Sequence, residues 1–205
     1  MNSEYLQKLM GEQEWKKFVS KSIDDKNELI QYLLENEILL MVDWKGEEQD
    51  GNIGDFFKYR NNILDSNTMV DFSSVYDKLQ ETISRNNLQT GDAVPFLLKE
   101  FQKQLKPIKQ VVILLNVGND NYYIGLARQK DLKVITTPSS DFWQFLSFGS
   151  KTGEVLYTVK CDCGSMNVWQ LKRGEVLTDD VCQDCGKILV DKEGNFTLPV
   201  EKDYI

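Results

Sequence analysis

Apolar residues recur three or four positions apart in five segments of the first half of the chain. A period near 3.6 residues places such side chains on one face of a helix. The five predicted helices cover residues 4–19, 25–36, 52–64, 72–84 and 92–105. Asp24 or Asp25 can cap the second helix, and Asp92 can cap the last. Pro95 falls in the first turn of that last helix, where its missing N–H costs little, and Pro107 ends it.

Three short apolar runs predict β-strands. Residues 37–44 (EILLMVDW) are bounded by the polar loop KGEEQDGN and are expected to form a buried strand. Residues 110–116 and 122–128 are rich in β-branched and aromatic side chains, and the turn residues Gly-Asn-Asp-Asn lie between them. This arrangement is typical of a β-hairpin.

The segment after the hairpin is expected to hold a further strand and a short helix. The strand covers residues 132–136, and the helix covers residues 141–148 with Ser139 or Ser140 as its cap. Residues 149–153 (GSKTG) have the composition of a linker.

Helices, single strands and a meander, in that order, predict an α+β fold in which N-terminal helices pack on a small mixed sheet. We expect this body to cover residues 1–150. A small β-rich domain, residues 151–205, is expected to follow it. A chain of 205 residues has room for one medium domain and one small one.

The cysteines form the clearest chemical constellation in the sequence. They occur as C-x-C-G and C-x-x-C-G, separated by 18 residues: Cys161, Cys163, Cys182 and Cys185. Two short pairs at about this separation are typical of tetrahedral Cys₄ zinc, because each tight turn points two sulfurs at one ion. The glycine after each pair permits the positive φ that such a turn needs. The sequence therefore predicts one Zn²⁺ per chain, bound by four thiolates.

Strand-like segments flank both cysteine pairs. Residues 155–160 lead into the first pair, and residues 187–190 leave the second. Between the pairs, residues 167–171 and 175–177 are expected to form a hairpin around the turn 172–174.

On these residues, the segment 155–198 resembles the zinc-ribbon family. It departs from the usual ribbon at the first pair, where Asp162 alone separates the two cysteines in place of two residues. The geometry of that turn must therefore differ. Because four thiolates leave the metal no open position for water, we expect a structural ion and not a catalytic one.

Two disulfides, or a redox-active C-x-x-C pair, are the competing interpretations. Disulfides are typical of exported proteins, and the first residues lack the basic-then-apolar pattern of a secretory signal. A redox C-x-x-C pair normally opens a helix after a strand, whereas Gly186 and a β-rich run follow Cys185. We therefore favour zinc.

Composition narrows the function classes further. The chain has no histidine, which excludes Ser-His-Asp and Cys-His catalytic pairs and His-ligated metals within it. Its formal net charge is −8, and no basic patch that would bind nucleic-acid phosphates is visible. Its apolar runs are far shorter than the roughly 20 residues that span a bilayer. We therefore expect a cytoplasmic protein without a membrane segment, for which nucleic-acid binding is disfavoured.

Carboxylates gather after the first predicted strand. Asp43, Glu47, Glu48, Asp50 and Asp55 can form a metal site or an acidic patch for a cationic partner, although the EF-hand spacing is absent. A solvated loop is the simpler explanation, because charge runs usually face water.

Two further features are candidates for a functional surface. Asp43 and Trp44 lie at a strand end, and the turn Asn119–Tyr123 is polar and aromatic. Trp44 is more often a core anchor than a ligand platform, and a hairpin turn accounts for residues 119–123. The sequence leaves both questions open.

The body also resembles a known family. Residues 38–64 and 110–136 are similar to an uncharacterised bacterial domain family, whose members pair a strand ending in an Asp-Trp-Lys-type motif with a later Gly-Asp-x-Tyr-type hairpin. The motif corresponds to Asp43, Trp44 and Lys45 here. The resemblance implies a small intracellular protein, and some members resemble immunity proteins of bacterial toxin systems. It implies no catalytic residues.

Three functional hypotheses follow, in order of preference. The first is a non-catalytic protein that acts through protein–protein contacts, in its concrete form an immunity- or antitoxin-like protein that masks a basic toxin domain. The second is a nucleic-acid-associated zinc-ribbon protein. The third is a carboxylate-dependent enzyme that uses Asp43 with Asp120, which requires the two side chains to meet in a cleft.

Overall fold

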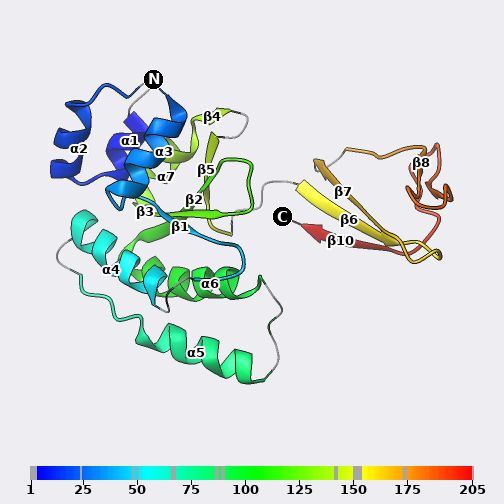
Figure 1. Cartoon of the computed structure of the whole chain (residues 1–205), viewed down its shortest axis with the longest axis horizontal. Helices are drawn as coiled ribbons and strands as arrows, with labels where there is room; N and C mark the ends of the chain where they lie inside the picture. Colours follow the sequence, from blue (N-terminus) through cyan, green and yellow to red (C-terminus); the bar gives the residue numbers. More distant parts are fainter. Residues whose placement is uncertain are drawn as a thin grey trace. The chain divides into compact units, whose positions relative to one another are not determined.

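The computed structural model describes residues 4–23, 25–47, 49, 51–65, 68–85, 88, 91–140, 143–149, 154–172 and 175–204. The chain divides into two compact units, Met1–Gly149 (unit 1) and Ser150–Ile205 (unit 2). The described residues form seven α-helices and several antiparallel sheets, and the cysteines lie in the β-rich C-terminal part (Figure 1). The predicted α+β class is therefore confirmed.

The helices of unit 1 follow the predicted apolar segments closely, with one split and one addition. They are α1 (Glu4–Leu9), α2 (Glu12–Val19), α3 (Lys26–Glu35), α4 (Asn52–Leu64), α5 (Ser73–Ser84), α6 (Ala93–Leu105) and α7 (Leu132–Thr136). The 3₁₀ turns η1 (Lys106–Ile108) and η2 (Gln129–Asp131) follow α6 and β3. Asp25 caps α3 by accepting hydrogen bonds from the backbone of Asn27 and Glu28, whereas the side chain of Asp92 makes no capping hydrogen bond to α6. Asp24 lies outside the described residues.

A five-stranded sheet forms the middle of unit 1. Its strands are β1 (Leu40–Val42), β2 (Gln110–Asn116), β3 (Tyr122–Arg128), β4 (Ser139–Ser140) and β5 (Trp143–Ser147), in the order β1-β3-β2-β5-β4. A mixed sheet was expected, but all the described pairings in it are antiparallel. The predicted hairpin of β2 and β3 is confirmed, and its short turn allows only an antiparallel pair.

The sheet is covered on both faces, which gives unit 1 three layers (Figure 1). Helices α1, α3 and α7 cover one face, and α4 and α6 cover the other, with α5 packed outside α6. Strand β2 alternates between the two cores: Ile113 and Leu115 enter the first, and Val112 enters the second. This double burial explains why residues 110–116 are almost continuously apolar.

Two short elements differ from the prediction. Residues 132–136 were expected to form a strand but form helix α7, in which Ile135 is fully buried in the first core. The expected helix at 141–148 is instead strand β5, since Trp143 and Phe145 alternate with partly exposed neighbours, as the period of two in a strand requires. Asp141 and Phe142 lie outside the described residues.

The predicted helix 4–19 is two helices that separate at Gly11. Gly11 has an extended backbone, and its N–H donates to Glu14 Oε2 at 2.7 Å. Arg60 of α4 lies fully buried beneath this break: its Nη2 donates to the Leu9 carbonyl at 2.7 Å, and its Nη1 pairs with Glu14. The break is therefore held by a residue that lies far away in the sequence.

Strand β1 is also shorter than the predicted run 37–44. After α3 the chain turns sharply: Ile38 N–H donates to the Leu33 carbonyl, and Glu37 has a φ of +52°. At the other end, Asp43 and Gly46 close a tight turn. Only three residues remain to pair with β3.

Glu100 joins α5 to α6 and carries a testable pH dependence. Its carboxylate is nearly buried, pairs with Lys78 Nζ at 3.0 Å and also binds Lys103. The hydrogen bond from Lys103 holds the pKa of Glu100 below its ordinary value. A lowered folded-state pKa stabilises the fold above the unfolded pKa, and this stabilisation is lost as the pH falls through the folded one.

We expect Glu100→Gln to lower the free energy of unfolding of unit 1 by about 1 kcal/mol at pH 7, since both lysines are more than half exposed and screened. The difference from wild type should shrink as the pH falls below about 4. Urea unfolding at both pH values measures it. Glu81→Gln is the control: it removes from α5 an exposed ion pair with Arg85, the residue that follows this helix, and should change the free energy of unfolding little. An equal deficit of Glu100→Gln at both pH values would contradict the electrostatic account.

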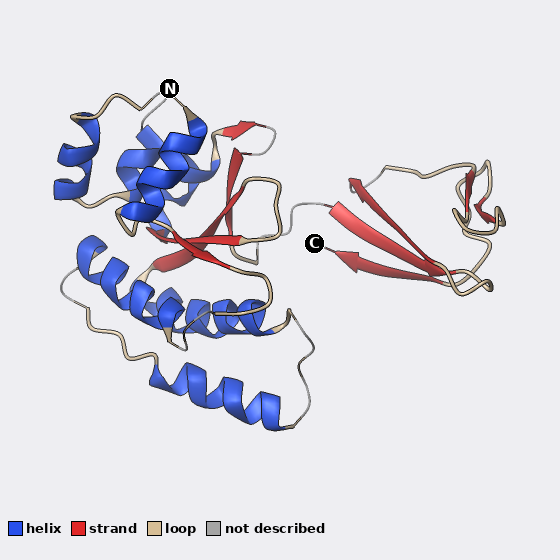
Figure 2. Ribbon diagram, in the orientation of Figure 1, coloured by secondary structure: helices blue, strands red, loops and turns tan. Residues whose placement is uncertain are grey.

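Unit 2 contains two small antiparallel sheets (Figure 2). Its strands are β6 (Glu154–Lys160), β7 (Met166–Lys172), β8 (Asp180–Val181), β9 (Ile188–Val190) and β10 (Val200–Tyr204), paired as β10-β6-β7 and β8-β9. The expected hairpin of residues 167–171 with 175–177 is wrong: β7 pairs with β6, and 175–177 is not a strand. Residues 173 and 174 of its predicted turn lie outside the described residues.

The core of unit 2 is small. Val159, Leu189 and Val190 are fully buried, and the rings of Tyr157 and Trp169 pack against Phe196 with centroids 5.4 and 6.0 Å away. A core of this size rarely holds a domain together without a disulfide or a metal.

Within the part of the chain that the structure describes, no helix combines the length and the apolar character needed to cross a membrane.

Candidate metal centre

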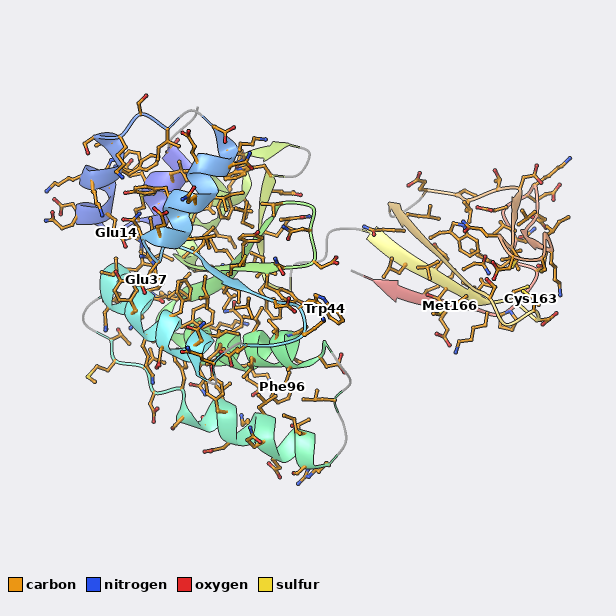
Figure 3. All side chains as sticks on the ribbon, in the orientation of Figure 1. Glu14, Glu37, Trp44, Phe96, Cys163 and Met166 are labelled. Carbon is orange, nitrogen blue, oxygen red and sulfur yellow. The ribbon has the colours of Figure 1, made fainter. Side chains whose placement is uncertain are left out.

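All four cysteines meet at one point of unit 2. Cys161 and Cys163 come from the turn between β6 and β7, and Cys182 and Cys185 come from the turn between β8 and β9; Figure 3 labels Cys163. The four Sγ atoms all lie within 4.8 Å of one another. The structure thus brings together every cysteine that the spacing predicted.

The sulfur separations fit a metal ion and not disulfides. Cys161 Sγ lies 3.6 Å from Cys185 Sγ, and Cys163 Sγ lies 3.7 Å from Cys182 Sγ. A disulfide needs about 2.05 Å, so the cysteines are free thiols here. Tetrahedral zinc with Zn–S bonds of about 2.3 Å places its sulfurs about 3.8 Å apart. The cluster could therefore hold one metal ion.

The two turns that present the sulfurs are built alike. In each, the first cysteine is buried and the second is exposed. Gly164 N–H donates to the Cys161 carbonyl at 2.9 Å, and Gly186 N–H donates to the Cys182 carbonyl at 2.8 Å. Both glycines have positive φ, +94° and +72°. The shorter C-x-C turn thus closes with the same hydrogen bond as the longer one, one residue earlier.

Gly164 offers a test of this backbone requirement. A Cβ at Gly164 would meet no atom within 4 Å, so the cost of Gly164→Ala comes only from its φ of +94°. We expect the metal affinity to fall by about 1 kcal/mol, roughly fivefold. Gly164→Asn should lose less, because asparagine tolerates positive φ better. Chelator competition measures both, and an alanine variant with wild-type affinity would refute the argument.

Asn167 is an outer partner of the cluster that the sequence did not reveal. Its side chain is buried, its Nδ2 donates to Cys182 Sγ at 3.7 Å, and its Oδ1 accepts from Gln183 N–H at 3.4 Å. The backbone N–H of Cys185, with further donors from Asp184 and Asn167, lowers the pKa of Cys182 to about 6. Hydrogen bonds of this kind orient a ligand and reduce the charge on its sulfur.

An ion pair connects the two cysteine turns at the surface. Lys187 Nζ, after the second pair, contacts Asp162, the single residue inside the first pair. The Asp162 carboxylate raises the pKa of Lys187. Asp162, the single residue between the first two cysteines, therefore links the first cysteine turn to the second.

The arrangement can bind one metal ion through four sulfurs and no other ligand. Such a closed tetrahedron leaves no position for a water or a substrate.

A family model matches unit 1, and the matched residues do not include the cysteines. The sequence model described as Domain of unknown function (DUF6630) matches residues 3–139, about two thirds of the chain. The chain belongs to the DUF6630 family. The expected likeness of the body to an uncharacterised domain family is confirmed at that level, and the cysteine cluster at 161–185 lies beyond the DUF6630 match. Comparisons with curated proteins and with solved structures found no match.

Within the DUF6630 domain, Asp43 and Trp44 form a turn directly after β1. Asp43 Oδ1 accepts from Lys45 N–H at 2.8 Å, and Gly46 N–H donates to the Asp43 carbonyl at 3.1 Å. Trp44 is 39% exposed and lies against the backbone of Gly91, and Lys45 Nζ stands 5.6 Å from its ring centre. Asp43 thus has a structural role in the turn.

Of the other predicted carboxylates, the two that the structure describes, Glu47 and Asp55, have separate partners. Glu47 accepts from Ile53 N–H at 2.6 Å and from the Tyr76 hydroxyl at 3.1 Å, so it caps α4 and links it to α5. Asp55 is exposed and pairs with Lys58. Glu48 and Asp50 lie outside the described residues.

The turn Asn119–Tyr123 is organised by its own amides. Asn119 Oδ1 accepts from Asn121 N–H at 3.1 Å, and Asn119 Nδ2 donates to the Tyr123 hydroxyl at 3.3 Å. Because Val42 pairs with Tyr122, Asp43 and Asp120 lie at neighbouring strand ends, but both side chains are exposed. Both carboxylates face solvent, whereas the enzyme hypothesis requires them to meet in a cleft.

Proposed function

We propose that this DUF6630 protein is a non-catalytic cytoplasmic binding protein whose C-terminal unit is a zinc ribbon held by one structural Zn²⁺. The closed four-sulfur cluster carries the proposal, with sulfur separations of 3.6 and 3.7 Å. Thiolate ligands in a tetrahedron suit zinc among the common divalent ions. Bound at this site, zinc would supply no catalysis and would fasten the two turns together.

The small core of unit 2 supports a structural role for the metal. Its fully buried hydrophobic side chains are few, and two of the ligands, Cys161 and Cys182, are themselves part of that core. Without the ion, four thiols would lie close together, and nothing would hold the two cysteine turns against the core. The free energy of metal binding in such a unit is largely its folding free energy.

The partner in this proposal is a protein and carries positive charge. The chain has a net charge of −8, which favours association with a basic surface and disfavours phosphate backbones. The resemblance of the body to immunity-like proteins makes a basic toxin domain the concrete candidate. Nucleic acid is not expected to bind.

Metal analysis of the purified, reduced chain tests the zinc assignment. We expect one zinc per chain and no visible absorption, because zinc is d¹⁰ whereas iron in four thiolates is coloured. If iron is bound instead, the assignment of zinc is wrong, although the site still binds a metal. A reduced, folded chain without any metal would overturn the assignment.

Co-purification with the product of the adjacent gene tests the binding role. A stable complex that weakens at high salt is the expected result, since a basic partner binds through charge. Salt-sensitive retention of the chain on DNA or RNA, with no protein partner, would instead support the second hypothesis.

A further inference from the structure

Among the strands that the structure describes, β1 is the last one at its end of the sheet of unit 1. In the described sheet order, β1 pairs only with β3, so one edge of Leu40–Val42 carries backbone groups that no described strand uses. An exposed strand edge is a template for another extended chain. Native proteins usually cover or charge such edges, so what lies beside β1 matters.

Beside this edge the two helical layers leave a depression of about 540 Å³. Leu34 of α3 and Glu37, two residues beyond the end of α3, line one wall. Asp55, Phe56 and Tyr59 of α4 line the other wall, and Met41 of β1 is also among the lining residues. We call these six residues the β1 trough.

Two large side chains of the β1 trough are exposed to solvent. Met41 is 47% exposed and Tyr59 is 40% exposed, although both lie next to buried core residues. On a β-edge, such side chains offer contact area to an incoming strand.

The charged residues that line the β1 trough are acidic. A second depression of about 560 Å³ shares Leu34 with it and includes Glu35. Glu35, Glu37 and Asp55 are the charged residues among those lining either depression, and the described lining contains no lysine or arginine. Lys58 does reach Asp55 from outside, at 3.4 Å, but both side chains are exposed and their pairing is weak.

We propose that the β1 trough binds an extended segment of a partner protein that alternates apolar and basic side chains and adds a strand to β1. This rests on the proposed binding function and assigns its site. Backbone hydrogen bonds to β1 would hold the segment, Met41 and Tyr59 would receive its apolar side chains, and Glu37 and Asp55 would receive its basic ones. A second copy of this chain is a poor occupant, because it would bring like charges together.

Model peptides test the assignment on the full, metal-loaded chain. The probe is a fluorescein-labelled decapeptide of alternating valine and lysine, and its control replaces every valine with glycine at equal charge. We expect the valine peptide to bind about tenfold more tightly and to slow hydrogen exchange at the amides of Leu40–Val42. Equal binding of the two peptides, or protection elsewhere without protection of β1, would overturn the assignment.

Matched variants test the trough itself. Glu37→Gln with Asp55→Asn should weaken binding of the valine peptide about tenfold, and Met41→Lys should weaken it at least as much. Glu12→Gln removes an exposed carboxylate from α2 and should leave binding unchanged. If Glu12→Gln weakens binding equally, general acidity is responsible and the trough is not the site.

Sedimentation of the free chain addresses self-association. We expect a monomer with and without Met41→Lys, and a dimer dispersed by Met41→Lys would replace the partner segment with a second copy. Zinc content and co-purification are measured separately. A peptide failure with one zinc per chain and a retained natural partner therefore removes only the β1 assignment.

Discussion

Replacing Cys182 with serine is expected to abolish metal binding and unfold unit 2, while unit 1 keeps its fold. Cys182 is 1% exposed, accepts from Asn167 and belongs to the small core of Val159, Leu189 and Val190. A serine oxygen is a poor ligand for a thiophilic ion, so one corner of the tetrahedron is lost. Structural zinc contributes on the order of 10 kcal/mol in small domains, more than a core of this size can replace.

Metal analysis and two-dimensional NMR measure the two outcomes in one sample. Resonances of residues 154–204 should collapse to unfolded positions, and those of residues 4–140 should stay. Gln183→Ser, whose side chain is exposed beside Cys182, is the matched control and should keep both metal and fold. If Cys182→Ser retains one metal per chain and a folded unit 2, the cluster is not what holds this unit. If unit 1 unfolds as well, the two units are not independent domains.

A helix or strand that buries one regular face can be predicted from its sequence. Helix α4 occupies its predicted residues 52–64, and its buried side chains recur at helical spacing. The hairpin of β2 and β3 is equally local, because its turn and both strands lie within 19 residues. In each case the neighbours that decide the structure are close in the sequence.

Two short elements were predicted wrongly, because a segment of five residues can fit both the helical period of 3.6 and the strand period of two. Residues 132–136 became a helix since Ile135 enters the core between α1 and the sheet, and residues 143–147 became a strand since they pair with β2. Tertiary packing decided both. The break at Gly11 likewise depends on Arg60, which the N-terminal sequence cannot reveal.

The metal ligands were predictable and their surroundings were not. Spacing alone identifies Cys161, Cys163, Cys182 and Cys185, because each pair sits on one tight turn. Asn167 reaches Cys182 only after β7 folds back on β6, and no local pattern marks it. The β1 trough also arises only where three separate segments meet. Residues that only the tertiary fold brings together cannot be identified from their spacing in the sequence.

The buried pair of Arg60 and Glu14 should have the largest effect within unit 1. Arg60 is fully buried, its Nη2 binds the Leu9 carbonyl, and its Nε has no hydrogen-bond partner among the described residues. Glu14, with a side chain 15% exposed, is the anion that this cation contacts. We expect Glu14→Gln to lower the free energy of unfolding by about 3 kcal/mol, because it leaves a buried charge without compensation. Thermal unfolding should shift down by roughly 10 °C for a unit of this size.

Two further variants separate charge from packing at this pair. Glu12→Gln, two residues before Glu14 in the same turn of α2 but with a side chain 78% exposed, should be nearly neutral. The double variant Arg60→Met with Glu14→Leu should recover most of the stability lost in Glu14→Gln, since an apolar pair needs no desolvation of charge. It should also loosen the break between α1 and α2, because the Leu9 carbonyl then loses its donor. If Glu14→Gln were as mild as Glu12→Gln, water would have to reach Arg60, and the break at Gly11 would owe its position to the glycine alone.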